Sequence, residues 1–378
     1  MTLLTVGDPS RVTGGYLFHR RLAERAPDHG AEMRFVSIPD LPLPWATATG
    51  PIWLLAPATR SADVFVLDSI AASAAAPWLD RVRAPVVGML HQPPGGIDAP
   101  HVQRRFRATF DRHAYRACKV LMVASDWLAA ELVAAGLPRN RLRVVEPGKD
   151  LDVAAGGRTD DVGIGGIDRA SLLRGRRMAA ICVANWLPRK GIVELLEAVA
   201  NLPDDVVTLH LVGDTATRGG YAGRVHERIE HADLRDRVVV HGLIHPAAVH
   251  QMYQSVDAFV LPSFEEPYGT VWGEAMAAGL PVVGWRAGNL PFLADHGRDG
   301  MLVSVGDIAA LGDAIESLAR DPALRKRLGQ AAHVRAAARP TWDQTAARFF
   351  AIIREVLSAG HDRSPAGRST DAQASADS

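Results

Sequence analysis

The chain has 378 residues, of which 48% are hydrophobic, and this length suits two α/β domains of roughly 150 to 200 residues each better than a single core. Lysine and arginine together number 42, as do aspartate and glutamate, so the formal net charge is +0. A balanced charge gives no support to a nucleic-acid partner.

Cysteine content and hydropathy exclude two further classes of protein. Cys118 and Cys182 stand singly in apolar surroundings, which fits neither a disulfide framework nor a zinc-type spacing. No apolar run approaches the roughly 18 residues of a membrane span, and the N-terminal stretch MTLLTVGDPS lacks a basic segment followed by an apolar one. We therefore expect a cytoplasmic protein that contacts a membrane, if at all, at its inner surface.

The first half of the chain alternates short apolar runs with helical, Ala/Arg-rich patterns. This alternation predicts a parallel sheet with helices on both faces. The predicted strands are Leu3–Gly7, Met33–Ile38, Val64–Leu67, Val86–Leu90, Val120–Val123 and Asn140–Val145.

Two features of this half could face a ligand. Gly14 and Gly15 lie between the first strand and a helical pattern, where backbone N–H groups can approach a ligand. His91 ends the fourth predicted strand. Because ligands of open parallel sheets bind at the carboxyl ends of strands, His91 is a candidate for lining the crevice, although a purely structural histidine fits the pattern equally well.

The segment from His101 to Lys119 gathers arginines and aromatic side chains around a single acid, Asp111. We interpret it as a solvated amphipathic helix. The alternative is a surface, carried by Arg104 to Arg116, for anionic lipid or a phosphorylated acceptor.

Residues 151–177 are rich in glycine and aspartate, which predicts an interdomain linker or an exposed loop. A second α/β run follows, and its polar end, residues 359–378, is expected to be disordered. The predicted strands lie near Ala179–Ala184, Val207–Val212, Val238–His241, Ala258–Leu261, Val282–Gly284 and Met301–Val303, and the predicted helices near Ala309–Ala319, Ala323–Ala338 and Asp343–Leu357.

The stretch from Leu261 to Val283 is predicted to run strand, loop, helix, strand, with Thr270 capping a helix that begins near Val271. Glu266 then lies in the loop and Glu274 in the first helical turns, so both carboxylates can face the crevice above the strand. The alternative is an acid of the capping region and a solvated helix residue, which is common for two glutamates at this spacing.

Residues that could contact a ligand follow each of the first four strands of the second half, and all should meet at one edge of the sheet. They are Asn185, Arg189 and Lys190 after the first strand, Gly213 after the second, Gly242 and Leu243 around the end of the third, and Glu266 and Glu274 after the fourth. Each alone is usually structural. Together they favour a binding site.

This set of groups suits a nucleoside diphosphate sugar. One carboxylate can hold ribose hydroxyls, cations and helix N–H groups can hold the diphosphate, and a second carboxylate can hold the hydroxyls of the sugar. Preorganised positive charge at a leaving diphosphate lowers the barrier to sugar transfer, so neither a metal ion nor a cofactor is required. The sequence shows no metal-ligand cluster of Asp, His and Cys at plausible spacing and no GxSxG, CxxC or P-loop motif.

The stretch PSFEEPYGTVWGEAMAAGLPVV resembles the E-x7-E signature of the retaining glycosyltransferases of family 4, with Glu266 and Glu274 at its two acidic positions. LPRKGIVELLEAV, LVGD and VVVHGLI are similar to further family segments. The resemblance covers residues 1 to about 358. It implies an α/β GT-B fold, in which two Rossmann-like domains, here residues 1–165 and 166–340, face each other across a cleft, and a helix at 341–358 completes the first domain.

The resemblance also implies residue roles. Glu274 would hold the donor ribose, Lys190 the diphosphate, and Glu266 the hydroxyls of the transferred sugar near the reacting carbon. Further contacts to sugar and phosphate would come from His91 at its strand end, from Gly15 in the glycine loop, and from the backbone N–H groups of Tyr268, Gly269, Thr270 and Val271. The family usually has an arginine where Asn185 stands, so diphosphate binding has one cation fewer unless Arg189 replaces it.

The expected function is transfer of a hexosyl unit from a UDP- or GDP-sugar to an acceptor hydroxyl, with retention and by front-face attack. The acceptor is unknown and could be a small molecule, a saccharide or a lipid headgroup. The alternatives are a nucleotide-sugar epimerase or glycosyl phosphorylase on the same fold, or a non-catalytic nucleotide-sugar binding protein.

Overall fold

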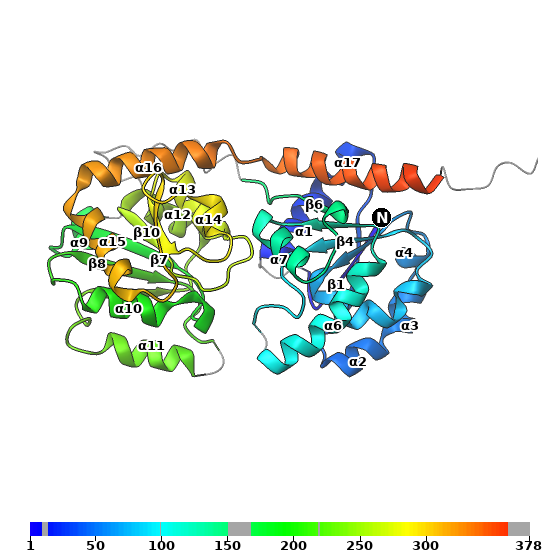
Figure 1. Cartoon of the computed structure of the whole chain (residues 1–378), viewed down its shortest axis with the longest axis horizontal. Coiled ribbons are helices and arrows are strands. Elements are labelled where there is room, and N and C mark those ends of the chain that lie inside the picture. The colour runs from blue at the N-terminus through cyan, green and yellow to red at the C-terminus, as the bar shows by residue number, and fades with distance from the viewer. Residues whose placement is uncertain (10–13, 99, 150–167, 218–219, 362–378) are drawn as a thin grey trace, which may run out of the picture.

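The computed structural model describes residues 1–9, 14–98, 100–149, 168–217 and 220–361. Two six-stranded sheets lie side by side along the long axis of the molecule, each flanked by helices (Figure 1). Every strand pairing in both sheets is parallel. This arrangement confirms the expected fold class.

The first sheet has the strand order β2-β1-β3-β4-β5-β6. Its strands are β1 (Thr2–Val6), β2 (Arg34–Ile38), β3 (Phe65–Asp68), β4 (Val86–Leu90), β5 (Val120–Val123) and β6 (Leu142–Val144). Its helices are α1 (Gly14–Arg25), α2 (Leu43–Ala48), α3 (Gly50–Leu55), α4 (Pro57–Arg60), α5 (Ala72–Ala75), α6 (His101–Ala117) and α7 (Asp126–Ala134), with short 3-10 turns η1 (Ala26–His29), η2 (Ser69–Ala71), η3 (Ala76–Arg81) and η4 (Arg139–Arg141).

The second sheet has the strand order β12-β11-β10-β7-β8-β9. Its strands are β7 (Met178–Val183), β8 (Val207–Val212), β9 (Val238–Gly242), β10 (Ala258–Val260), β11 (Val282–Trp285) and β12 (Gly300–Val303). Its helices are α9 (Arg169–Leu173), α10 (Ile192–Ala200), α11 (Tyr221–Ile229), α12 (Pro246–Ser255), α13 (Thr270–Ala277), α14 (Leu290–Leu293), α15 (Ile308–Arg320) and α16 (Pro322–Ala337), with the 3-10 turn η5 (Pro188–Lys190).

The central strands are apolar along their whole length because helices cover both faces of each sheet. All residues of β3, β4 and β8 are buried, which is the pattern of a parallel strand rather than the alternation of a half-exposed one. Aspartate caps the two long helices beside β12, since Asp307 accepts from the backbone of Ala310 and Asp321 from that of Leu324.

The last helix, α17 (Trp342–His361), leaves the second half and lies across the half that contains β1 and β4 (Figure 1). Its apolar face packs into one core cluster with Leu3, Phe18 and Leu22. The side chains that it buries there are Trp342, Ala346, Phe349, Phe350, Ile352, Ile353 and Val356.

Two sequence-based boundaries need correction. The segment predicted as linker, residues 151–177, contains α9, capped by Asp168, whose carboxylate accepts from the backbone N–H groups of Ala170 and Ser171. The tail predicted from residue 359 begins later, since α17 reaches His361. The rest of the linker, residues 150–167, and residues 362–378 lie outside the described residues, and so does the predicted domain boundary at 165, which stays a prediction.

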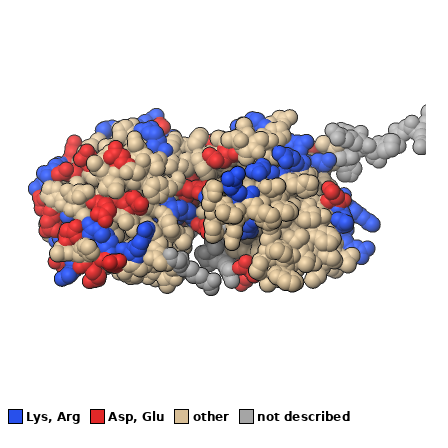
Figure 2. Space-filling view, turned by 60° about the horizontal axis from the view of Figure 1, so that its bottom comes forward, with Lys and Arg blue, Asp and Glu red and all other residues tan. Residues whose placement is uncertain are grey.

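On the face drawn in Figure 2, basic and acidic side chains are interspersed over the half built on the second sheet. A membrane-spanning helix, one both long and apolar enough, is not found among the described residues. A cytoplasmic location stays a prediction.

Candidate functional site

The strands that carry the predicted site are consecutive in the second sheet. The order β10-β7-β8-β9 places the carboxyl ends of these four strands side by side, as expected. Chain order reverses between β7 and β10, because β7 continues to β8 and β9 on one side and β10 to β11 and β12 on the other. A reversal of this kind opens a crevice at the strand ends, where open α/β sheets bind ligands.

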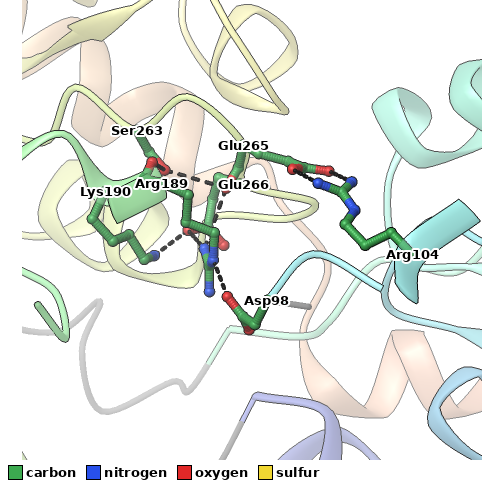
Figure 3. A network of polar contacts seen from close by, with 7 residues as sticks. All are labelled: Asp98, Arg104, Arg189, Lys190, Ser263, Glu265 and Glu266. Atoms are coloured by element: carbon green, nitrogen blue, oxygen red, sulfur yellow. Dashed lines mark hydrogen bonds and ion pairs between the residues drawn. The ribbon is translucent and has the colours of Figure 1, made fainter. Parts of the chain in front are cut away.

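Lys190 and Glu266 meet at this crevice. The Lys190 ammonium donates to Glu266 Oε2, and an Arg189 guanidinium nitrogen lies 3.5 Å from the same oxygen (Figure 3). All three side chains are less than one fifth exposed, at 12% for Lys190, 18% for Arg189 and 15% for Glu266. An ammonium has three donors, so Lys190 can hold Glu266 and a phosphate oxygen at once.

Gly191 explains how the loop after β7 comes so close to the loop after β10. Its φ is +68°, and a Cβ there would lie 2.1 Å from the carbonyl oxygen of Pro262. On the other side of the same contact, the carbonyl of Arg189 accepts from the Phe264 N–H at 2.7 Å and from the Ser263 hydroxyl at 3.0 Å. Backbone contact between the two loops therefore fixes the position of the Lys190 main chain, from which its side chain extends.

We expect Gly191→Ala to lower the thermal unfolding midpoint more than Gly297→Ala does. Gly297 also has a positive φ, +76°, but no atom of the described residues lies within 4 Å of its Cβ position. The Gly297 change should cost only the backbone strain, about 1 to 2 kcal/mol, while the Gly191 change adds about 1 to 3 kcal/mol for pushing the loops apart. Equal midpoints for the two variants would contradict the close contact with Pro262.

Arg189 also links the two halves of the molecule. Its Nε lies 2.6 Å from Asp98 Oδ1, on the segment that follows β4, and another of its nitrogens donates to the carbonyl of Glu265 at 3.2 Å. Beside it, Arg104 of α6 forms a two-pronged ion pair with Glu265, at 2.8 and 3.1 Å (Figure 3). The residues around Glu266 are thus held from both sheets.

The Arg104 contact corrects the interpretation of the basic helix. Arg104 lies partly buried between the halves rather than on a solvated face. Arg105 and Arg116 on the same helix are exposed, so an anionic surface contact through them stays a prediction.

Asn185 and Gly213 have local structural roles at the ends of β7 and β8. The Asn185 side-chain oxygen accepts from the Asp214 N–H at 3.1 Å. A Cβ on Gly213 would lie 2.1 Å from the carbonyl oxygen of Ala184, and its own N–H donates to the Gly242 carbonyl at 2.9 Å. The glycine therefore lets three neighbouring strand ends pack together.

Gly242 and Leu243 form an open, apolar position beside them. Gly242 has a φ of +65°, and within the described part of the chain no atom lies within 4 Å of its Cβ position; Leu243 is 75% exposed. An exposed leucine next to an uncovered glycine provides a surface on which a flat ring can lie.

Helix α13 brings the second glutamate and a set of backbone donors. Gly269, with a φ of +83°, is the N-cap, and Thr270 is the first helical residue and makes no capping hydrogen bond, so the expected Thr270 cap is wrong. A Cβ on Gly269 would lie 2.2 Å from the Trp272 ring, which explains why glycine rather than threonine takes the cap position. No acceptor among the described residues receives the N–H groups of Thr270 and Val271, and such free N–H groups attract anions.

Glu274 and Tyr268 are held from the sides of this helix. Glu274 Oε2 lies 3.5 Å from the hydroxyl of buried Tyr253. The Tyr268 hydroxyl donates to the Pro147 carbonyl at 3.0 Å, and the Arg339 guanidinium lies 5.0 Å from the centre of its ring. Tyr268 therefore joins the halves through its side chain, while its backbone carbonyl accepts from the Asn289 amide at 2.8 Å.

His91 and Gly15 lie together at the edge of the first sheet. A Cβ on Gly15 would lie 3.4 Å from Cδ2 of His91. Burial lowers the pKa of His91 to about 3, so its imidazole is neutral at physiological pH.

The sequence did not reveal that His91 has two polar neighbours, His19 on α1 and Asp68 at the end of β3. One ligand atom from each of the three residues lies within 4.8 Å of the others. Sequence spacing does not reveal this cluster, because its members come from three separate elements. A usable signal was present, since Asp68 and His91 both end neighbouring strands and His19 follows Gly15 by one helical turn. The Nε2 atoms of His91 and His19 lie within hydrogen-bond distance of each other, so these two nitrogens are joined by a hydrogen bond.

Two family models and several known proteins match this chain. Residues 14–153 match the family model described as Glycosyltransferase Family 4, and residues 167–335 match the model described as Glycosyl transferases group 1. A D-inositol 3-phosphate glycosyltransferase of Corynebacterium efficiens is 30% identical over 320 residues, covering 75% of this chain and 69% of the relative. Another of that name, from Corynebacterium jeikeium, is 32% identical over 240 residues, covering 60% of this chain and 55% of the relative. In the second case the chain spans little more than half of the relative.

Two solved structures share the fold. Sucrose-phosphate synthase from Thermosynechococcus elongatus superposes with a TM-score of 0.78 at 20% identity, over 95% of this chain and 99% of that one. The Anabaena protein HepE, in complex with UDP and glucose, superposes with a TM-score of 0.74 at 20% identity, over 95% of this chain and all of that one (100%). At this level of identity the likeness concerns the fold alone.

Proposed function

Because the chain belongs to glycosyltransferase family 4, we propose that it is a retaining enzyme that transfers a hexosyl unit from a UDP- or GDP-sugar to an acceptor hydroxyl. The observation that carries this proposal is the meeting of Lys190, Arg189 and Glu266 at the strand-order reversal. Cations and a carboxylate held in one crevice suit a diphosphate joined to a sugar.

The donor would lie along the edge of the second sheet. In this proposal its base rests near Gly242 and Leu243, and Glu274 accepts hydrogen bonds from the ribose hydroxyls. Its diphosphate lies between Lys190 and the free N–H groups of α13, and its sugar reaches Glu266 and His91. Gly15 leaves room beside the His91 ring, because a Cβ at that position would already contact the imidazole, at 3.4 Å from Cδ2.

The chemistry follows from this placement. The acceptor hydroxyl oxygen bonds to the anomeric carbon on the face from which the diphosphate departs, and the carbon–oxygen bond to the diphosphate breaks. The proton of the acceptor passes to a phosphate oxygen of the leaving group. Lys190 and the helix N–H groups stabilise the charge that develops on that group, so the step needs no metal ion and no cofactor.

The comparisons suggest which substrates to try first. The HepE structure contains UDP and glucose, and the curated relatives are named for D-inositol 3-phosphate. UDP-glucose and an inositol phosphate are therefore the first donor and acceptor to test, beside GDP-sugars and uncharged polyols.

We expect UDP or GDP and the corresponding sugar nucleotide to raise the unfolding temperature, while ADP does so less. A ligand at a hundred times its dissociation constant stabilises the folded state by about 2.7 kcal/mol. The measurement is a thermal-shift screen, followed by assay of the best sugar nucleotide with and without acceptor. Consumption without any acceptor would indicate an epimerase, and consumption only with phosphate a phosphorylase. The proposal fails if no nucleotide changes the unfolding temperature.

A further inference from the structure

Behind His91 runs a chain of buried polar side chains that leads away from the crevice. His91 Nε2 lies 3.1 Å from Nε2 of His19, and His19 Nδ1 lies 3.7 Å from Oδ2 of Asp68. The side chains of His19 and Asp68 are 1% and 3% exposed, whereas His91 is partly exposed. These three side chains therefore connect the interior of the first sheet to the carboxyl ends of its strands, where the sugar would lie.

Neither histidine carries a charge at neutral pH. Burial lowers the pKa of His19 and that of His91 to about 3. A neutral imidazole has one N–H and one bare nitrogen, so one of the two Nε2 atoms donates and the other accepts. The direction of this hydrogen bond decides which nitrogen of His91 is left bare.

Asp68 sets the direction. Its carboxyl group accepts from the Thr5 hydroxyl at 2.7 Å and from the Ser69 hydroxyl and the Ile70 N–H at 3.3 Å each. Burial raises the pKa of Asp68, and the hydrogen bonds that its oxygens accept oppose this rise. Because Thr5, Ser69 and Ile70 all present donors to these oxygens, the carboxyl group faces His19 as an acceptor. The nitrogen that faces it, His19 Nδ1, has no hydrogen-bond partner among the described residues.

A proton on His19 Nδ1 points an N–H at a carboxylate oxygen, whereas a bare Nδ1 would set a lone pair against it. His19 is therefore protonated at Nδ1 and accepts at Nε2. His91 then donates from Nε2, and its Nδ1 is bare. The His91 ring is held in place by Phe18, which meets it edge to face at 5.1 Å.

We propose that Asp68 and His19 are positioning residues that keep His91 in its Nε2–H form, so that Nδ1 accepts a hydrogen bond from a substrate hydroxyl. This inference rests on the proposed function for the identity of the hydroxyl, which belongs to the transferred sugar or to the acceptor. With its low pKa, His91 is a weak general base at neutral pH, so it orients the hydroxyl and takes no proton from it.

The test is the tautomer of His91 in the full chain, read from imidazole ¹⁵N shifts of labelled protein at pH 7. We expect the Nε2–H form in the wild type. In Asp68→Asn, the side-chain amide can donate to His19 Nδ1, which reverses the hydrogen bond between His19 and His91 and moves the proton of His91 to Nδ1. His19→Phe keeps a ring in the same space, removes the acceptor for Nε2–H, and should shift His91 the same way; it serves if Asp68→Asn does not fold.

The activity readout is kcat against donor KM. We expect Asp68→Asn to lower kcat by about 10- to 100-fold, the effect of losing one hydrogen bond at the reacting sugar, with the donor KM nearly unchanged. His29→Phe is the matched control. His29 stacks on Phe350, with the two ring centres 4.8 Å apart, and is not part of the cluster of His91, His19 and Asp68. This variant should therefore leave the His91 tautomer and kcat unchanged.

An Nδ1–H form in the wild type, or the same form in the wild type and Asp68→Asn, would overturn the inference. So would an unchanged kcat in a variant whose tautomer has reversed. The spectra need no substrate. If they agree with expectation and no sugar nucleotide is consumed under any condition, the proposed function fails while the hydrogen-bond chain stands.

Discussion

Replacing Lys190 with alanine lowers kcat by about 10²- to 10³-fold, the usual effect of removing one preorganised donor from a charge that develops in the transition state. Lys190 is the lysine at the crevice, and its side chain is 12% exposed, so bulk solvent is a poor substitute for its charge. Steady-state kinetics with the sugar nucleotide identified in the thermal-shift screen measure the loss. Lys119→Ala, at an exposed position, is the control and should retain full activity.

The Lys190→Ala change also removes a contact to Glu266, and its effect on kcat must be separated from that of the missing charge at the diphosphate. Without Lys190, the Glu266 carboxylate keeps, among the described residues, only the longer contact to Arg189, at 3.5 Å, which leaves it free to move. A double-mutant cycle with Glu266→Gln distinguishes the two effects. If Lys190 acts only by holding Glu266, the double variant is no slower than Glu266→Gln alone. If Lys190 also stabilises the leaving diphosphate, the double variant is slower by a further large factor. The first result would remove the proposed role of Lys190 at the diphosphate.

The fold was predictable because parallel sheets leave a strong local signal. Strands such as Val86–Leu90 and Val207–Val212 were bounded correctly to the residue, since a strand buried on both faces is an unbroken apolar run. The edge occupied by the candidate site followed from the same signal. Gly213 comes directly after such a run and Gly242 ends another, while Lys190 and Glu266 lie in the loops that follow two more; carboxyl ends of neighbouring parallel strands must meet.

The contacts that arrange this edge could not be predicted, because they join residues far apart in the sequence. The ion pair of Arg104 with Glu265 and that of Arg189 with Asp98 connect the two halves, and nothing local to any of these residues points to its partner. The helix pattern of residues 101–119 even favoured a solvated face for Arg104. His19 was overlooked for a different reason: an apolar helix face with one histidine resembles ordinary core, although its place one helical turn after Gly15 pointed to the same end of the sheet.

Backbone conformation also limited what could be predicted from the sequence, as the start of α13 illustrates. Threonine is a good N-cap residue, so Thr270 was the reasonable choice from the sequence. In the structure the chain must turn through a left-handed residue just before the helix, and only Gly269 does this easily. The consequence is functional, since the turn leaves the N–H groups of Thr270 and Val271 pointing away from any acceptor in the described part of the chain.

Replacing Glu274 with glutamine should weaken donor binding by about 10- to 150-fold, equivalent to the 1.5 to 3 kcal/mol of a hydrogen bond to a charged acceptor. A carboxylate has two oxygens and can accept from both ribose hydroxyls. The amide of glutamine has one acceptor oxygen, and its NH₂ group can only donate. The proposed ribose contact lies away from the reacting carbon, so kcat at saturating donor should change much less than affinity.

Calorimetric titration of the nucleotide and of its sugar measures this effect. Because the lost contact is to the ribose, the free nucleoside diphosphate and the sugar nucleotide should lose affinity by the same factor. Glu227→Gln, on the exposed face of α11, is the matched control in the same half of the molecule. A Glu274→Gln variant that binds both ligands as tightly as the wild type would contradict the ribose assignment. A loss confined to the sugar nucleotide would instead place Glu274 at the sugar, and would require the donor to lie in the opposite direction along the strand ends.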